Sequence, residues 1–377
     1  MTMTIVPGSG GAQIVPGNAN AFSFIGGFVG FFKDGGAIVN CHNTADVSGI
    51  SDRSGSQVMV GGIIGGSHYS FSSDPHCYIA DCSSTGDITV GALGAWPMAG
   101  GIAGVLAGGG STLAGSTHIT RCYAKGTISL HSAAANGWPY LGGIVGYLYV
   151  GAKVSQCYFD GSVIAEIANN YTGGIAGYSS YATGYNPANN NPGWIEDCWS
   201  SGLIRGNINA GGIVGQNQAN VFLRRCYSTA TVQAKEARFV GAASMAGVGG
   251  ISGMNSSALT DALSACVALN PSLLSETKVN NALGYGENIY RVTGLNSAGA
   301  NGDIANNYAL AGMQLKAAGD PIDIVTVDSA RLGPDQPHGE DLAEAKPAQS
   351  FYAGIGWSFS NVWKMGSDGY PKLRWQK

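Results

Sequence analysis

The amino-acid sequence predicts an all-β protein, a parallel β-solenoid of about seven three-sided coils with a divergent C-terminal cap. Three observations carry this prediction: a glycine motif recurs along the chain, one cysteine follows each copy, and short extended stretches fill the remainder of each repeat. Self-similarity at such a spacing is typical of stacked units that bury one continuous core. The motif is a glycine pair, an apolar residue, one further residue and another glycine, and it begins at Gly26, Gly61, Gly100, Gly142, Gly173, Gly211 and Gly249.

One repeat contains three extended stretches. In the shortest clear copy they cover residues 142–147, 153–158 and 161–166, with turn residues between them. Alternation along the chain directs Ile144 and Val163 to one interior, and β-branched residues suit such half-buried strand positions. The glycine pairs let backbone layers approach closely at a corner. Each repeat is therefore predicted to form one triangular coil.

The cysteines follow the same periodicity. Since equivalent positions stack, we expect a buried ladder of free thiols rather than disulfides, because cysteine behaves as a small hydrophobic residue. The eighth cysteine, Cys77, lies outside this ladder. The ladder members are Cys41, Cys82, Cys122, Cys157, Cys198, Cys226 and Cys266.

The chain divides into three predicted parts. Residues 1–25 form an N-terminal cap, residues 26–280 form the repeats, and residues 281–377 form a divergent coil, a loop insertion and a cap. The loop insertion is assigned to the proline-containing stretch 319–349. The closing aromatic residues are expected to form a hydrophobic lid over the open end of the core, since large rings close such a core well. These lid residues are Trp357, Trp363 and Trp375.

Composition limits the partners. The net charge is -4 and the 19 Lys and Arg residues are scattered, whereas nucleic-acid binding needs clustered basic residues. The uncharged run 88–110 contains a repeat glycine pair, so we expect no membrane insertion. Residues 1–11 lack the pattern of a secretory signal peptide. The sequence implies no cofactor.

The repeat resembles a known family. Residues 142–146 (GGIVG) followed by 156–163 (QCYFDGSV) resemble the GLUG repeat of bacterial surface and secreted proteins, and residues 351–376 resemble the segment that commonly ends such arrays. The resemblance implies an extracellular or cell-surface β-solenoid of adhesin-like proteins, some of which are attached to immunoglobulin A-type metallopeptidases. The peptidase activity does not carry over, because the chain contains no His-Glu-x-x-His motif.

Aromatic residues on loops and corners are the predicted ligand-binding residues. Exposed rings beside Asn and Ser suit sugars or protein surfaces, since flat apolar faces pack while amides supply hydrogen bonds. The alternative is that these rings shield the core at the corners. The candidates are Tyr69, Trp96, Trp138, Tyr181, Tyr185 and Trp194.

Two clusters could support other chemistry. A zinc site would use one inserted loop, but the spacing matches no finger pattern and a solvated turn is favoured. A polysaccharide hydrolase or lyase would need paired carboxylates on adjacent coils. The zinc candidates are His68, Asp74, His76 and Cys77. The carboxylate candidates are Asp81, Asp160, Glu196 and Asp197.

The sequence therefore predicts a non-catalytic extracellular binding or adhesion module for a glycan or a surface protein. Two alternatives stay open. One is a structural solenoid that self-associates end to end into filaments through exposed sheet edges. The other is a carbohydrate-active enzyme.

Overall fold

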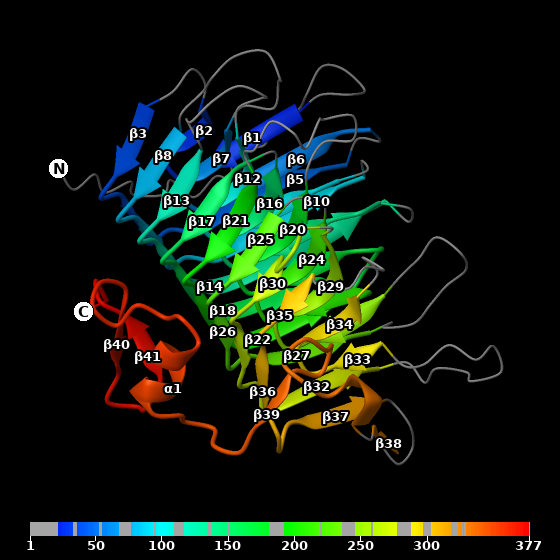
Figure 1. Ribbon diagram of the computed structural model, residues 1–377. Helices are drawn as coiled ribbons and strands as arrows, with labels where there is room; N and C mark the ends of the chain where they lie inside the picture. Colours follow the sequence, from blue (N-terminus) through cyan, green and yellow to red (C-terminus); the bar gives the residue numbers. More distant parts are fainter. Residues whose placement is uncertain are drawn as a thin grey trace.

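The protein is described here by a computed structural model. It describes residues 22–376 apart from 33–35, 53–54, 68–76, 94–95, 109–116, 135–136, 150, 181–191, 219–220, 236–245, 258, 277–287, 297–302, 318–322, 326 and 328. The chain winds as a stack of coils whose equivalent strands pair in parallel, as predicted (Figure 1).

Strands from successive coils form four main sheets, which we name A to D. Sheet A contains β1 (Phe22–Gly26), β6 (Gln57–Gly61), β11 (Met98–Gly100), β15 (Tyr140–Gly142), β19 (Tyr171–Gly173), β23 (Asn209–Gly211), β28 (Gly247–Gly249) and β33 (Ile289–Tyr290). Sheet B contains β2 (Val29–Phe32), β7 (Ile64–Ser67), β12 (Ala103–Ala107), β16 (Val145–Tyr149), β20 (Ala176–Ser180), β24 (Val214–Gln218), β29 (Ser252–Ser256) and β34 (Thr293–Asn296). Sheet C contains β3 (Gly36–Val39), β8 (Cys77–Ala80), β13 (His118–Thr120), β17 (Lys153–Ser155), β21 (Gly193–Glu196), β25 (Val221–Arg224), β30 (Leu263–Ser264) and β35 (Ile304–Ala305).

Sheet D is the largest and includes the segments that follow each cysteine. It contains β4 (His42–Asn43), β5 (Val47–Ser51), β9 (Ser83–Ser84), β10 (Ile88–Ala92), β14 (Tyr123–Ala133), β18 (Tyr158–Ile164), β22 (Trp199–Gly206), β26 (Tyr227–Ser228), β27 (Thr231–Ala234), β31 (Val267–Ala268), β32 (Ser272–Ser275), β36 (Tyr308–Leu310), β37 (Gln314–Ala317), β38 (Asp323–Ile324) and β39 (Glu340–Leu342). The remaining elements are η3 (Ser329–Arg331), α1 (Gln349–Gly354), β40 (Trp363–Met365) and β41 (Pro371–Leu373).

Each coil contributes strands to four sheets, one more than the three stretches expected from the sequence. The additional segment is the sheet A strand that ends at the glycine pair, so the pair joins two short strands instead of beginning one. A Cβ on Gly101 would lie 2.4 Å from the carbonyl oxygen of Gly143 in the next coil. A Cβ on Gly104 would lie 2.7 Å from the backbone nitrogen of Val60. The motif glycines therefore let sheets A and B pack backbone against backbone.

In the part of the chain that the structure describes, the stack has eight coils, each with one strand in sheets A, B and C. The eighth is the divergent coil, whose strands β33, β34 and β35 join these sheets and whose strand β36 joins sheet D. The first coil begins with β1, inside the range predicted as an N-terminal cap, and the other residues of that range lie outside the described part of the chain. Among the described residues no helix is long and apolar enough to cross a membrane.

The predicted thiol ladder is confirmed. All cysteines are free, and every ladder member is buried except Cys41, which is half-buried. The Cys157 thiol donates to the Ser155 carbonyl at 3.1 Å, and the other thiols of the ladder make equivalent contacts. In the eighth coil Asn307 takes the ladder position and accepts a 2.9 Å hydrogen bond from the backbone N–H of Cys266.

The residue before each ladder position turns the chain. Its φ lies between +49° and +56°, in the left-handed region. This corner directs the cysteine inward and the residue after it outward, so the outward residues form a second row, which we call the outer ladder. The corner residues are Asn40, Asp81, Arg121, Gln156, Asp197, Arg225, Ala265 and Asn306. The outer ladder consists of His42, Ser83, Tyr123, Tyr158, Trp199, Tyr227, Val267 and Tyr308.

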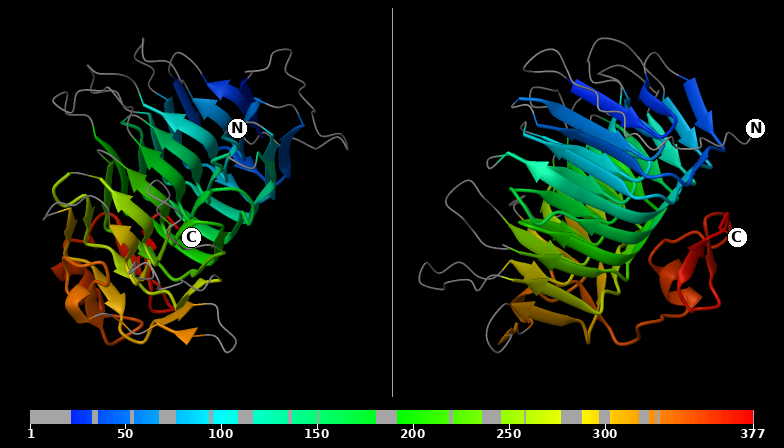
Figure 2. Two further views of the ribbon diagram at one scale, coloured as in Figure 1. Left: turned by 90° about the vertical axis from the view of Figure 1, so that its right-hand side faces the viewer. Right: turned by 180° about the vertical axis from the view of Figure 1, so that it is seen from behind.

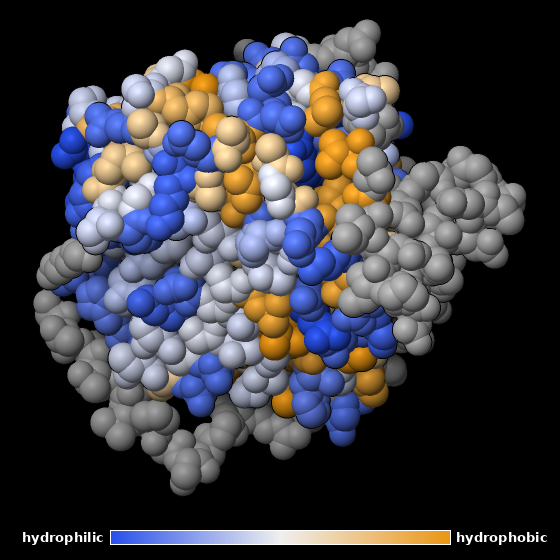
Figure 3. Space-filling view, turned by 90° about the horizontal axis from the view of Figure 1, so that it is seen from below, coloured by the Kyte–Doolittle hydropathy of each residue, from blue (hydrophilic) through white to orange (hydrophobic). Residues whose placement is uncertain are grey.

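The stretch predicted as a loop insertion covers the C-terminal end of the stack. The backbone N–H groups of Val292 and Thr293, at the sheet edge, donate to the Pro337 carbonyl at 3.0 and 3.2 Å. Arg291 is only 1% exposed and pairs with Asp341 at 2.7 Å. Strand β39 then pairs with β36. Seen from this end, the surface has hydrophobic patches separated by hydrophilic residues (Figure 3).

The tryptophan-rich tail, in contrast, is not a lid over the core, and that prediction was wrong. Residues 349–376, which we call the C-terminal subdomain, lie beside the stack (Figures 1 and 2). They form a hydrophobic cluster separate from the solenoid core, packed on Trp199, Tyr227 and Val267 of the outer ladder. The aromatic outer ladder provides a large apolar surface on the side of the stack, and the tail covers that surface.

Three tryptophan indole N–H groups of the C-terminal subdomain form hydrogen bonds with corner residues of the solenoid. Trp375 Nε1 donates to the Gln156 carbonyl at 3.0 Å and Trp357 Nε1 donates to the Ala265 carbonyl at 2.9 Å. Trp363 Nε1 lies 3.2 Å from an Asp197 carboxylate oxygen. Each tryptophan thus contacts a different coil.

Candidate ligand-binding groove

The outer ladder presents a stack of parallel rings. Tyr123 and Tyr158 have ring centroids 5.0 Å apart and planes 4° apart, and Tyr158 and Trp199 are 4.7 Å and 2° apart. The geometry follows from the register, because these three residues pair directly across neighbouring strands of sheet D. Offset parallel rings at this distance attract one another.

The C-terminal subdomain ends over this stack. The Trp375 ring lies 5.7 Å from Tyr158 and 6.4 Å from Tyr123. Gln376 is held by Trp199, whose indole N–H donates to its side-chain oxygen at 3.1 Å. Coils nearer the N-terminus are left uncovered at this point, and a cavity opens there.

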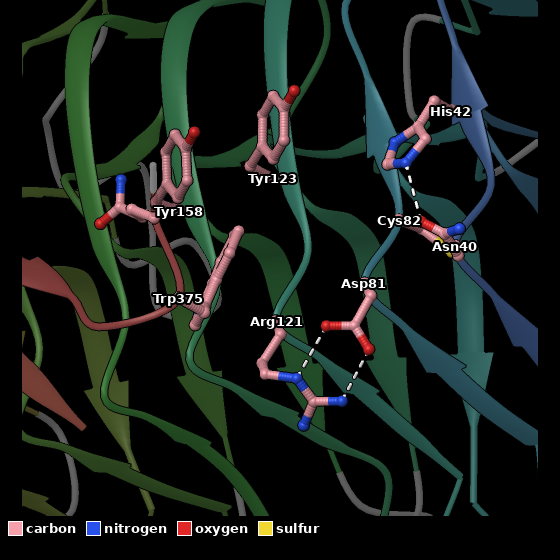
Figure 4. A pocket seen from close by; sticks show the side chains of 9 residues that line it. Asn40, His42, Asp81, Cys82, Arg121, Tyr123, Tyr158 and Trp375 are labelled. Carbon is pink, nitrogen blue, oxygen red and sulfur yellow. Dashed lines mark hydrogen bonds and ion pairs between the residues drawn. The ribbon is translucent and has the colours of Figure 1, made fainter. Parts of the chain in front are cut away.

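This first cavity has a volume of about 360 Å³, within the range of small-ligand sites (Figure 4). Its apolar wall is the edge and face of three aromatic rings, and its polar wall comes from the corner residues of the first three coils. The lining residues are Asn40, His42, Asp81, Cys82, Arg121, Tyr123, Tyr158, Trp375 and Gln376.

The polar wall is held by two contacts between coils. Arg121 donates two hydrogen bonds to the Asp81 carboxylate, at 2.8 and 2.7 Å. These bonds and the positive charge of Arg121 lower the pKa of Asp81. His42 Nδ1 lies 2.8 Å from the Ser83 hydroxyl and Nε2 lies 3.1 Å from the Asn40 side-chain oxygen. The wall therefore presents fixed donors and acceptors beside the rings.

A second cavity of about 420 Å³ lies on the other side of Tyr158 and Gln376, between sheet D and the β40–β41 hairpin. Because both cavities share those two residues, we treat them as one feature and call it the seam. The second cavity is lined by Lys125, Tyr158, Asp160, Trp199, Lys364, Gly366, Ser367, Asp368, Lys372 and Gln376.

The predicted aromatic loop residues lie elsewhere. Trp96 precedes β11 of sheet A and is 37% exposed, and Trp138 precedes β15 and packs on Tyr171 at 5.6 Å. Trp194 lies in β21 of sheet C, beneath the Lys153 ammonium at 3.7 Å. These three tryptophans line neither cavity. The remaining candidates Tyr69, Tyr181 and Tyr185 fall outside the described residues.

Of the four candidate zinc ligands, only Cys77 lies in the described part of the chain. Cys77 is buried in β8, and desolvation raises its pKa to about 12, so a thiolate there is disfavoured. His68, Asp74 and His76 fall in one of the gaps of the description. Over the described ranges no group of three or more His, Cys, Asp or Glu residues could hold a metal ion.

The carboxylate candidates are engaged by neighbouring coils. Arg225 donates to Asp197 at 2.8 Å and to Glu196 at 2.7 Å, as Arg121 does to Asp81. Ser201 donates to Asp160 at 2.6 Å and Lys125 lies 3.9 Å from it. Each of these carboxylates therefore has a basic residue beside it. The arginines belong to the next coil. They are far from these carboxylates in the sequence, and the register of the strands brings them together.

Sequence reasoning also missed the seam itself. The residue after the ladder cysteine is aromatic in most coils, and this row is the signal in the sequence that points to the seam. The participation of Trp375 and Gln376 depends on where the tail docks, and no sequence periodicity gives that position.

Comparison with known proteins supports the fold. No family model matches the chain, and no curated protein matches it. A solved structure from Bacteroides ovatus, which bears the provisional name immunoglobulin A1 protease, is similar, with a TM-score of 0.50 and 17% sequence identity. The match covers 91% of this chain and 88% of that chain. At this identity the likeness concerns the fold alone, and the resemblance to GLUG repeats stays a prediction.

Proposed function

We propose that the chain is a non-catalytic, extracellular binding module that holds a glycan in the seam. The observation that carries the proposal is the first cavity, where the rings of Tyr123, Tyr158 and Trp375 lie beside the fixed Asp81–Arg121 pair. The apolar faces of sugar rings pack on aromatic rings, while their hydroxyl groups need planar donors and acceptors nearby. The cavity supplies both.

The assignment as non-catalytic rests on the state of the carboxylates. Glycoside hydrolysis needs a carboxylic acid that is protonated at the working pH, beside a second carboxyl group. Arg121 instead lowers the pKa of Asp81, and Arg225 donates to both Glu196 and Asp197. This arrangement favours structural pairing over proton transfer.

The compartment is inferred from similarity. The resemblance of the repeats to those of bacterial surface and secreted proteins supports an extracellular or cell-surface location. An adhesin-like role follows if the glycan belongs to another surface.

Glycan-array binding followed by calorimetry tests the proposal. We expect Tyr123→Ala to weaken glycan binding about five- to thirtyfold, since loss of a central ring in an interface commonly costs about 1 to 2 kcal/mol. Trp96→Ala is the matched control, because it removes an exposed ring away from the seam. Binding lost in Trp96→Ala but kept in Tyr123→Ala would move the site to the loops. Absence of binding to any glycan would overturn the proposal.

Self-association is a second candidate, favoured by the first coil. Its exposed apolar residues include Phe22 at 46% and Val39 at 48%, with Phe31 and Ile50 also exposed. The opposite end is occupied by Pro337 and β39, so pairing through the first coil gives dimers and not filaments. Light scattering of the full chain over a range of concentrations tests this: a monomer throughout would exclude it.

A further inference from the structure

The second cavity of the seam gathers positive charge. Of the residues that the structure describes, three lysines line it, Lys125, Lys364 and Lys372, and its carboxylates are those of Asp160 and Asp368. Only 11% of the chain's residues are charged, so three ammonium groups around one cavity are a local concentration. The lysines come from two different parts of the fold, since Lys125 lies on β14 of the solenoid and the others lie on the β40–β41 hairpin.

The partners of the three lysines differ. Lys372 lies 3.0 Å from Asp368 and 4.4 Å from the centroid of the Trp199 ring, so its charge is largely satisfied. Lys125 has a loose contact of 3.9 Å with Asp160. Asp160 also accepts a hydrogen bond from Ser201, so Lys125 holds only part of that carboxylate.

Lys364 is the least compensated. It donates to two backbone carbonyls, of Gln376 at 2.6 Å and of Arg374 at 3.5 Å. Among the described residues no carboxylate lies within salt-bridge distance of its ammonium group. The two carbonyls fix the position of Lys364 at the cavity wall without neutralising it. A fixed ammonium group without a carboxylate partner attracts an anion.

We infer that the ligand of the seam is an acidic glycan, whose carboxylate or sulfate group lies in the second cavity between Lys364 and Lys125 while a neighbouring sugar ring packs on Tyr123 beside the edge of Tyr158. The inference rests on the proposed function and deepens it. The two cavities adjoin at Tyr158 and Gln376, so a short oligosaccharide can occupy both. Each lysine offers three donors to the anionic group.

The test uses the full chain and three classes of oligosaccharide of equal length: neutral, uronic-acid-containing and sulfated. We expect an acidic class to bind at least tenfold more tightly than the neutral class in low salt, and the difference to shrink as salt rises. Whichever of the two acidic classes binds more tightly identifies the acidic group.

The variants separate charge from structure. Lys364→Gln removes the charge but can still donate to a backbone carbonyl, and we expect it to weaken acidic-glycan binding at least tenfold and neutral-glycan binding much less. Lys125→Gln should act in the same direction. Lys316→Gln, on β37 of the last coil, makes the same charge change away from the seam and should have no effect.

The outcomes separate the inference of an acidic ligand from the proposal that the seam binds a glycan. Equal affinity for neutral and acidic glycans, or unchanged acidic-glycan binding in Lys364→Gln, overturns this inference and leaves the proposed function standing if Tyr123→Ala still weakens binding. Absence of binding in all three classes overturns both.

Discussion

Replacement of Trp363 should release the C-terminal subdomain from the solenoid without unfolding the coils. Trp363 is fully buried, and its ring lies 4.6 Å from Trp357 and 6.1 Å from Tyr227 of the outer ladder. Truncation of a buried tryptophan to alanine costs about 3 to 5 kcal/mol, from lost burial and from the cavity left behind. The hydrogen bond to Asp197 is lost as well, but that carboxylate remains paired with Arg225.

The expected consequence is local. The subdomain cluster is separate from the solenoid core, so the lost energy belongs to docking of residues 349–376. A loss of about 3 to 5 kcal/mol increases the population of the undocked state by roughly two to four orders of magnitude. Hydrogen exchange measured by mass spectrometry should show faster exchange in residues 349–376 and unchanged protection in β14 and β18.

Trp363→Phe is the control, since it keeps a ring in the cluster and removes the indole N–H. Its effect on exchange should be clearly smaller than that of Trp363→Ala. Equal loss of protection in the subdomain and in the central strands would refute the reasoning, because it would mean that tail and solenoid unfold as one unit.

Three further predictions concern the solenoid. Gly101→Ala should abolish soluble, folded protein because its Cβ would meet backbone of the next coil, whereas Gly312→Ala, with no atom within 4 Å, should change the melting temperature little. In the native protein Cys41 should be the only ladder thiol that reacts with a thiol reagent at pH 8, and the others should react only after denaturation; early reaction of several thiols would contradict the buried ladder. The Asp81 carboxylate, whose pKa is lowered by Arg121, contributes stability above its unfolded pKa of about 4, and that contribution is lost as the pH falls through the folded value. Because the pair is half-exposed, Asp81→Asn should cost at most about 1 kcal/mol at neutral pH and should reduce the acid sensitivity of denaturant-induced unfolding; unchanged acid sensitivity would refute the assignment.

The repeat architecture could be predicted because its signals are local and recur. Ladder cysteines such as Cys157 mark one position per coil, and the motif glycines mark another. The strand before each glycine pair was missed because its residues, for example Met98–Gly100, form only a three-residue segment with little alternation. Periodicity alone does not separate such a short strand from a turn.

The seam could not be predicted, because it depends on contacts between distant parts of the chain. Trp375 and Gln156 are 219 residues apart, and Arg121 and Asp81 are 40 apart. The tryptophans of the tail were expected to close the open end of the core, and they cover the aromatic outer ladder instead. Which surface they cover depends on the aromatic outer ladder, whose outward orientation follows from the left-handed corner before each cysteine.

Because the tail docks at fixed coils, the number of coils determines the length of the surface that the tail leaves uncovered. Its tryptophans form hydrogen bonds with corner residues of the fourth, fifth and seventh coils, at Gln156, Asp197 and Ala265, and Trp375 also stacks beside Tyr123 of the third coil. In a protein with one coil more or fewer at the N-terminal end of the stack, the tail would stay in place. The surface of sheet D that the tail leaves uncovered beside Trp375 would then be longer or shorter by one strand spacing, about 4.8 Å. Variation in coil number would then change the span of surface offered to an extended ligand in regular steps.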